Sequence, residues 1–219
     1  MTALCEELLR SPGLGSLLGR LQEVYAEEQR RREEFRQSVT EGEKAEFING
    51  EVVVHSPVRL SHSLVSQALF TLLRAHVLAH GLGVVGHEKL MVSLTRNDYE
   101  PDVCFFSTEK AAGFEPHQMR FPAPDFVAEI LSPSTEARDR GVKMEDYAAH
   151  GVAEYWLLEP EEQVLEQYLL SGETYHLNVR SSTGTVTSTA VPGFVIPIPA
   201  LFDERENLQT LRVLVEGAR

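Results

Sequence analysis

Cysteine is almost absent from this chain, and the features of a membrane or secreted protein are missing as well. Only Cys5 and Cys104 occur among the 219 residues, so neither a disulfide framework nor a cysteine-built metal site is indicated. No apolar run approaches the ~20 residues of a membrane helix. The start of the chain also lacks the basic and then apolar regions of a secretory signal. We therefore expect a cytoplasmic protein that does not associate with membranes.

Positive charge is the second shortage. The chain has 20 Lys and Arg against 33 Asp and Glu, which gives a formal net charge of -13. This balance counts against a protein that coats nucleic acid through a broad basic surface. It is compatible with a local basic groove, and a metal site built from carboxylates would itself add negative charge.

The overall composition is that of a globular protein. Hydrophobic residues make up 42% and charged residues 24% of the chain, which argues against a disordered or fibrous protein. A chain of 219 residues fits one large domain or a domain with an appendage.

The N-terminal segment carries a helical pattern. Between residues 15 and 38, apolar side chains recur at helical spacing among many Glu, Arg and Gln residues, and the stripe fades toward its end. We predict an amphipathic helix there, and we divide the chain into a helical extension, residues 1–40, and a main domain, residues 41–219. The mixed-sign run that starts at Gln29 is either a solvated helix face or a dimerisation arm.

Turn and helix signals organise the first half of the main domain. Asn49-Gly50 lies between two β-prone runs and predicts a two-stranded hairpin. Ser56-Pro57 supplies an N-cap residue followed by proline, which predicts a helix from there to Gly81. Short strands are expected at residues 84–85 and 90–94.

The second half alternates strands with a helix. One strand opens at Pro101, and the apolar run that starts at Pro124 predicts a strand covered on both faces. A helix over residues 134–150 and a strand from Glu154 follow, so parallel pairing of the two strands is expected. The fold class is thus α/β (α+β): a mixed sheet flanked by helices, with an N-terminal helix and a C-terminal antiparallel meander. The predicted strands of the meander are residues 164–170, 174–179 and 185–191.

Two carboxylates in this pattern need an explanation. Glu129 lies inside an apolar strand, where a carboxylate is costly unless it is paired, hydrogen-bonded or bound to a metal. If Asp102 lies on a neighbouring strand, the two carboxylates converge and repel until a divalent cation neutralises them. Oxygen ligands favour Mg²⁺ or Mn²⁺ over zinc. The alternative is a structural ion pair between Glu129 and an arginine, such as Arg138 or Arg140.

Lys143 lies on the helix that follows. Asp139, Lys143 and Tyr147 are spaced four residues apart and therefore share one helical face. That face either turns toward the carboxylates or carries only a surface ion pair between Asp139 and Lys143. Periodicity does not choose between the two.

Five segments of the chain, taken in order, share the pattern of a known family. They are Phe47-Ile-Asn-Gly-Glu51, Ser56-Pro57 with His62, Pro101-Asp102-Val, Pro124 through Glu129-Ile-Leu-Ser-Pro-Ser-Thr, and Lys143 through Tyr147 to Gly151-Val-Ala-Glu-Tyr-Trp-Leu. These segments resemble the Uma-two family of restriction endonucleases (domain of unknown function 820) in the PD-(D/E)xK nuclease superfamily. The resemblance runs from about Glu43 to Phe202.

The resemblance implies a restriction-endonuclease-like fold and carries Asp102 and Glu129 over as the metal-binding pair. Most such nucleases place a lysine two residues after that glutamate, where this chain has Leu131. Lys143 is therefore the candidate for a catalytic lysine that has moved to the helix.

Three further residues are candidates for the same site. Glu51 matches the family's Gly-Glu after the hairpin turn, and it is a third acidic ligand, a residue that positions water, or a polar residue leaving a tight turn. His62 either reaches the site or is a structural histidine. Tyr147 shares the helical face of Lys143.

The sequence therefore predicts hydrolysis of phosphodiester bonds in nucleic acid, with DNA as the expected partner and one or two Mg²⁺ or Mn²⁺ ions at the carboxylates. One alternative is a catalytically inactive nuclease-fold module for binding or assembly, which the charge of -13 favours. Another is a metal-dependent hydrolase of small phosphoesters, which a closed pocket would indicate. We also expect a homodimer, because nucleases of this fold often cut two strands with two subunits and the N-terminal helix offers an apolar stripe.

Overall fold

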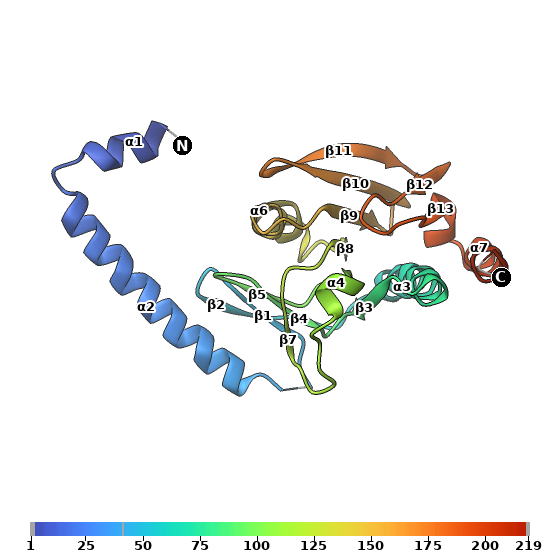
Figure 1. Cartoon of the computed structure of the whole chain (residues 1–219), viewed down its shortest axis with the longest axis horizontal. Helices are drawn as coiled ribbons and strands as arrows, with labels where there is room; N and C mark the ends of the chain where they lie inside the picture. The colour runs from blue at the N-terminus through green and yellow to red at the C-terminus, as the bar shows by residue number, and fades with distance from the viewer. Residues whose placement is uncertain (1–2, 41, 218–219) are drawn as a thin grey trace.

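The computed structural model describes residues 3–40 and 42–217. Two N-terminal helices precede a mixed α/β body in which two sheets meet and helices cover them (Figure 1). The described helices are α1 (Ala3–Arg10), α2 (Leu14–Ser38), α3 (Leu60–His80), α4 (Thr108–Ala111), α5 (Glu136–Arg138), the π-helix η1 (Asp139–Lys143), α6 (Met144–Ala149), the 3-10 helix η2 (Ile198–Leu201) and α7 (Glu204–Glu216).

The larger sheet confirms the predicted mixed topology. Within the described part of the chain it has six strands in the order β11-β10-β9-β8-β6-β3. β8 and β9 pair in parallel through the crossover formed by α5, η1 and α6, and the other neighbouring pairs are antiparallel. The bounds are β3 (Gly83–His87), β6 (Val103–Ser107), β8 (Phe126–Ile130), β9 (Glu154–Glu159), β10 (Val164–Ser171) and β11 (Thr174–Ser181).

A second sheet is built around the predicted hairpin. Asn49 and Gly50 both have positive φ, 50° and 85°, as a two-residue hairpin turn requires. The order of the described strands is β2-β1-β5-β4-β7. The bounds are β1 (Ala45–Ile48), β2 (Glu51–Val54), β4 (Met91–Ser93), β5 (Asp98–Tyr99) and β7 (Arg120–Phe121).

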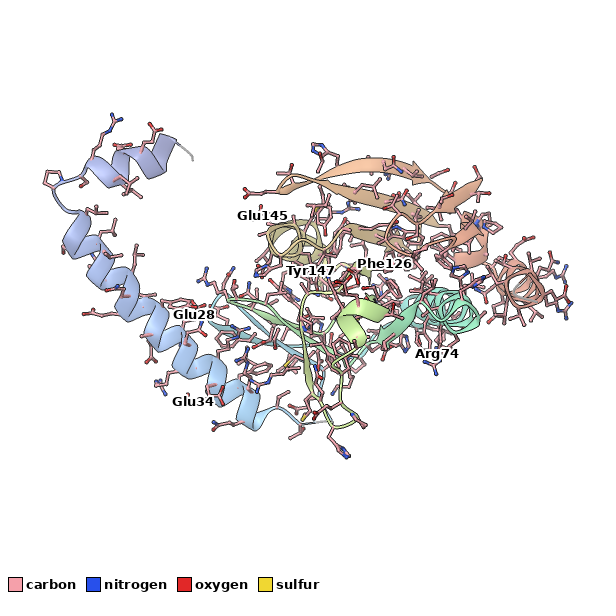
Figure 2. All side chains as sticks on the ribbon, viewed as in Figure 1. Glu28, Glu34, Arg74, Phe126, Glu145 and Tyr147 are labelled. Atoms are coloured by element: carbon pink, nitrogen blue, oxygen red, sulfur yellow. The ribbon has the colours of Figure 1, made fainter. Side chains whose placement is uncertain are left out.

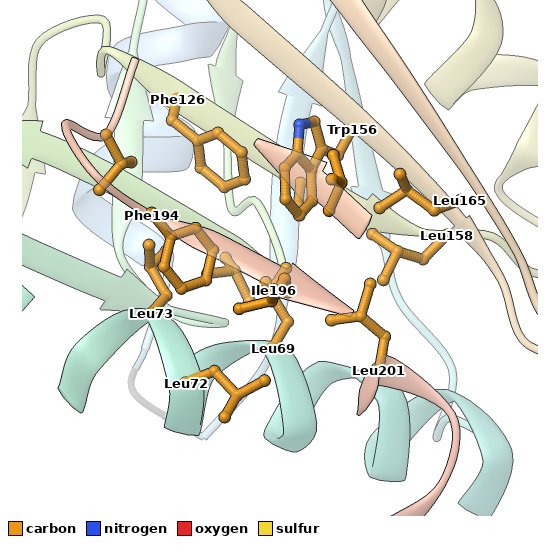
Figure 3. Packing of buried hydrophobic residues seen from close by; sticks show 14 of the residues in the cluster. Leu69, Leu72, Leu73, Phe126, Trp156, Leu158, Leu165, Phe194, Ile196 and Leu201 are labelled. Carbon is orange, nitrogen blue, oxygen red and sulfur yellow. The ribbon is translucent and has the colours of Figure 1, made fainter. Parts of the chain in front are cut away.

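α3 packs its apolar side chains against the six-stranded sheet. Leu69, Leu72 and Leu73 are fully buried and belong to the same hydrophobic cluster as Phe126 and Trp156, with Phe194 and Ile196 between the helix and the two rings (Figure 3). Removing these side chains from water is the main stabilising contribution of this face. The same contacts fix the position of the helix above the strands that carry the candidate site.

The predicted start of α3 at Ser56-Pro57 is wrong, because the helix begins at Leu60. The hairpin continues beyond β2, where the His55 N–H donates to the Lys44 carbonyl at 2.9 Å. The residues between His55 and Leu60 then cross from the sheet to the helix, so they are not free to start a helical turn.

α2 forms over the predicted residues, but the body covers only one end of it. Glu28, Arg32 and Phe35 are buried, whereas Leu21 and Val24 are 56% and 61% exposed. The first half of α2 and α1 stand clear of the body, and Glu28 marks where α2 reaches the hairpin (Figures 1 and 2). The division of the chain near residue 40 stays a prediction.

The C-terminal region contains the expected antiparallel meander of β10 and β11. The third expected strand is β12 (Thr185–Thr187), which pairs with β13 (Val195–Pro197) in a two-stranded ribbon of its own. α7 then packs beside α3 (Figure 1). Among the helices of residues 3–40 and 42–217, none has the length and apolar character needed to cross a membrane.

Candidate active site

Four carboxylates meet where the two sheets approach each other, counted among the described residues. Glu46 on β1, Asp102 before β6, Glu129 on β8 and Asp139 at the start of η1 are between 0% and 4% exposed. We call these four side chains the acidic cluster. Burial of so many carboxylates requires compensating charge or hydrogen bonds.

The pairing of β6 with β8 places Asp102 beside Glu129. The Asp102 N–H donates to Glu129 Oε2 at 3.3 Å, and the Ile130 N–H donates to Asp102 Oδ2 at 2.9 Å. The two candidate metal ligands are therefore adjacent and fixed by backbone groups of each other's strands.

Lys143 lies at the centre of the acidic cluster. Its ammonium Nζ is 3.0 Å from Glu46 Oε1, 3.1 Å from Glu129 Oε1 and 3.2 Å from Asp139 Oδ1. It follows a kink between two helical segments at Gly141, whose dihedral angles, φ -113° and ψ -107°, are not helical. The pair with Asp139 is thus buried within the cluster and does not lie on the surface.

No arginine among the described residues forms the structural ion pair with Glu129. Arg140 pairs with Glu136 and Glu166, and Arg138 donates to the Ser134 carbonyl. The cation that contacts Glu129 is Lys143.

Three further side chains complete the site, and sequence reasoning missed two of them. Lys44 Nζ lies 2.7 Å from Asp102 Oδ1, and His62 Nε2 lies 3.2 Å from Asp102 Oδ2. His55 Nε2 lies 3.0 Å from Glu46 Oε2. His62 was expected as a candidate, whereas Lys44 and His55 were not.

Glu46 was also missed, although the sequence contains a signal for it. It lies between Ala45 and Phe47 in an apolar strand, which is the same pattern that identified Glu129. Its carboxylate takes the third acidic position that had been expected for Glu51.

The structure does not bring Glu51 to the acidic cluster. Glu51 is exposed at the start of β2, opposite Ile48, and it lines a different hollow together with Arg31 and Phe35. Tyr147 is a buried residue of α6, with its ring centroid 5.3 Å from that of Tyr99, and Figure 2 shows it on the inner side of that helix.

The electrostatics of the cluster are those of surplus negative charge. Burial raises the pKa of Glu129 well above 4.5, and Asp139, Asp102 and Glu46 add to this rise while Lys143 opposes it. Burial also raises the pKa of Asp139. Lys143 stays charged, because the surrounding carboxylates outweigh its burial and raise its pKa.

The other two carboxylates are held ionised. Burial opposes ionisation of Glu46, but Lys143 and His55 lower its pKa to about 2. Burial likewise opposes ionisation of Asp102, and His62 and Lys44 lower its pKa. When all four carboxylates are ionised they outnumber the two lysines, and a divalent cation would supply positive charge that the cluster lacks.

The donor chemistry of the site fits Mg²⁺ or Mn²⁺. A cavity of about 380 Å³ is lined by Asp102, Glu129 and Asp139, together with His62. His62 Nδ1 is buried without a hydrogen-bond partner, and carboxylate oxygens suit these hard cations. Within residues 3–40 and 42–217, no three acidic, histidine or cysteine side chains are already arranged to hold a metal ion.

Comparison with known proteins identifies a matching family. The family model Uma2, described as "Putative restriction endonuclease", matches residues 32–199. The uncharacterized protein slr1290 of Synechocystis is 34% identical over 121 residues, which are 53% of this chain and 60% of that protein. This chain therefore spans about three fifths of that relative.

A solved structure shares the fold. A crystal structure described as a putative nuclease belonging to DUF820, from Anabaena variabilis, superposes with a TM-score of 0.68. The match covers 82% of this chain and 97% of that chain at 20% sequence identity. This likeness supports the fold alone.

Proposed function

We propose that this chain, which belongs to the Uma2 family, is a metal-dependent nuclease that hydrolyses phosphodiester bonds of nucleic acid, with DNA as the expected substrate. The observation that carries the proposal is the buried acidic cluster at the base of a cavity, with Lys143 at its centre. A cluster with raised carboxylate pKa values in a cleft is typical of a functional site. A purely structural cluster would not need a surplus of carboxylates.

Asp102 and Glu129 are the side chains that would hold Mg²⁺ or Mn²⁺. When bound, such an ion lowers the pKa of water and stabilises charge on a phosphate. The backbone amides of Asp102 and Ile130 orient the two carboxylates before any ligand enters. This fixed orientation avoids a reorganisation cost at the moment of reaction.

Lys143 keeps a fixed positive charge beneath the cleft. Because its ammonium contacts three carboxylates and its pKa is raised, it does not act as a proton acceptor. Its role is to hold Glu129 in place and to reduce the repulsion that an incoming phosphate would meet. His62 lies with Nε2 on Asp102 and leaves Nδ1 without a partner, so Nδ1 can bond to a group that enters the cleft.

A hydrolase of small phosphoesters is the second candidate function. It is favoured by the size of the cavity, about 380 Å³, and by the burial of the reacting carboxylates at its base. The cavity is lined by few cationic side chains, with Arg59 and Arg138 among them. A protein that binds nucleic acid broadly would present many more.

The test is cleavage of plasmid and single-stranded DNA with Mg²⁺ or Mn²⁺ by wild type and Glu129→Gln, purified identically. Glu145→Gln is the matched control, because Glu145 is an exposed carboxylate on α6 (Figure 2). We expect activity in wild type and the control and its loss in Glu129→Gln. Equal activity in all three proteins contradicts the proposal. A bis-aryl phosphodiester in the same assay separates the two candidate functions, because a small-phosphoester hydrolase would cleave it while leaving DNA intact.

We also propose that a second copy of the chain covers the exposed stripe of α2. Leu18, Leu21, Val24 and Tyr25 are each more than half exposed, at 51%, 56%, 61% and 51%, and their spacing places them along one side of the helix. Light scattering is expected to report a dimer in wild type and a monomer in Leu21→Asp. A monomeric wild-type protein at micromolar concentration would contradict this proposal.

A further inference from the structure

Lys44 occupies one oxygen of a candidate metal ligand. Its ammonium Nζ lies 2.7 Å from Asp102 Oδ1. The second oxygen, Oδ2, accepts the Ile130 N–H at 2.9 Å and lies 3.2 Å from His62 Nε2. Both Lys44 and Asp102 line the cavity, so the ammonium stands where an ion entering from the cavity would meet this carboxylate.

The two lysines of the site differ in how firmly they are held. Lys143 is 3% exposed and contacts three carboxylates from three different elements. The Lys44 side chain is 21% exposed and, within the part of the chain that the structure describes, forms an ion pair with Asp102 alone. A long lysine side chain at the edge of a site can move its ammonium into water without any change in the backbone. Lys44 can therefore leave the cluster, whereas Lys143 cannot.

We propose that Lys44 is a displaceable internal cation that competes with the divalent metal for Asp102. The inference rests on the proposed metal site and adds a residue that controls entry to it. In the arrangement described here Lys44 supplies part of the positive charge that the acidic cluster requires. The metal ion and the Lys44 ammonium compete for the same carboxylate oxygen of Asp102 and repel each other. Binding of the metal therefore requires displacement of Lys44. The apparent affinity for the metal is then reduced by the fraction of molecules in which Lys44 remains on Asp102.

The experiment is calorimetric titration of Mn²⁺ into wild type, Lys44→Gln, Lys44→Arg and Lys110→Gln. Lys110 is the matched control, because its Nζ forms an ion pair with Asp125 Oδ1 at 3.0 Å away from the cavity. We expect Lys44→Gln to bind Mn²⁺ roughly tenfold tighter or more, since the competitor is a charge-assisted hydrogen bond. Lys44→Arg keeps the charge and stays weak, and Lys110→Gln binds like wild type.

The outcomes separate this inference from the proposed function. If wild type binds Mn²⁺ and Lys44→Gln binds it equally or more weakly, the role of Lys44 is overturned while the metal site stands. If neither protein binds Mn²⁺, both proposals are overturned. Addition of Glu129→Gln to Lys44→Gln must abolish the gain, which ties the binding to the acidic cluster.

A measurement on the wild-type chain does not depend on the folding of any variant. Amine labelling followed by mass spectrometry reports the accessibility of each lysine. We expect Mn²⁺ to increase the labelling of Lys44 and to leave that of Lys110 unchanged. Unchanged labelling of Lys44 at saturating Mn²⁺ would show that the ammonium stays on Asp102 and would overturn the proposal.

Discussion

Two clusters of buried charge in this molecule have opposite designs. Where α2 meets the hairpin sheet, a single fully buried carboxylate, Asp98, lies between two guanidinium groups. Arg32 donates to Asp98 at 2.7 and 2.8 Å, and Arg36 donates to it at 3.0 and 2.9 Å. In the acidic cluster, four carboxylates share two lysines.

The difference separates a structural ion pair from a site that is ready for a ligand. Burial tends to raise the pKa of Asp98, but Arg32 and Arg36 overcome that tendency and lower it. Burial raises the pKa of Glu129 instead, and neighbouring carboxylates increase the rise. A carboxylate that two guanidinium groups already neutralise gains little from another cation. Carboxylates that repel one another are stabilised when a further cation binds. The first cluster therefore attaches α2, and the second is suited to binding.

The largest predicted effect is on the structural cluster. Arg32→Met removes the donors to Asp98 and to the carbonyls of Leu94 and Asn97, all within a region that is almost fully buried. Removing one partner of a buried ion pair costs about 3–5 kcal/mol, so we expect a loss of that size in the free energy of unfolding, measured with urea. Arg30→Met is the control on the same helix, where the exposed pair with Glu27 is expected to contribute nothing measurable. Equal losses in both variants would contradict the distinction.

Glu129→Gln is predicted to have a much smaller effect on stability, although it removes a buried charge. Lys143 keeps its contacts with Glu46 and Asp139, and one source of carboxylate repulsion is removed. We expect the free energy of unfolding to change by less than about 1 kcal/mol. A loss as large as that of Arg32→Met would show that Glu129 belongs to a structural pair.

The pH dependence of stability also tests whether Glu129 belongs to a structural ion pair. The carboxylate of an ordinary ion pair stabilises the fold more as the pH rises, whereas Glu129 is expected to stabilise it less. Because the pKa of Glu129 is raised in the folded state, the folded chain binds more protons than the unfolded chain above pH 4.5. Its contribution to stability is therefore present below pH 4.5 and is lost as the pH rises through the folded pKa. The slope is at most about 1.4 kcal/mol per pH unit for one group.

The measurement is urea unfolding of wild type and Glu129→Gln at several values between about pH 4 and 8. The difference between the two proteins should move in favour of the variant as the pH rises. On the acid side, Glu46 works the other way, because its pKa is lowered to about 2. Its contribution is present above its ordinary value of 4.5 and is lost as the pH falls toward 2. A difference between wild type and variant that does not change with pH would contradict the raised pKa of Glu129.

The sequence predicted those site residues that lie in strongly patterned segments. Asp102 and Glu129 precede or interrupt apolar strands, so each could be singled out, and their proximity was expected on the condition that the two strands are neighbours, as the antiparallel pairing of β6 with β8 makes them. The inward position of Lys143 could not be inferred, because it depends on the kink at Gly141, and no local pattern specifies such a kink. Lys44 precedes β1 of one sheet and Asp102 precedes β6 of the other, so their contact is a tertiary arrangement that hairpin signals do not contain.

The hairpin itself was predicted correctly, but Glu51 was considered for the site and Glu46 was not. Glu46 lies on β1, whose four residues are all buried, while Glu51 lies on the edge strand β2, where most side chains face water. The letters Gly-Glu after the turn gave no information on which strand would be covered. The position of β1 between β2 and β5 determines that Glu46, and not Glu51, is covered.

The smallest predicted effect is that of a substitution at Glu51, the exposed glutamate of the hairpin. Glu51→Gln changes an exposed side chain outside the acidic cluster, so we expect a change in unfolding free energy within about 0.5 kcal/mol and unaltered Mn²⁺ binding. Glu46→Gln is the matched variant on the same hairpin, and it removes one of the three carboxylates that hold the Lys143 ammonium. Calorimetric titration with Mn²⁺ distinguishes the two. If Glu51→Gln binds Mn²⁺ more weakly and Glu46→Gln binds it like wild type, Glu51 is the third acidic residue of the metal site. The hairpin would then have to rearrange when the metal binds.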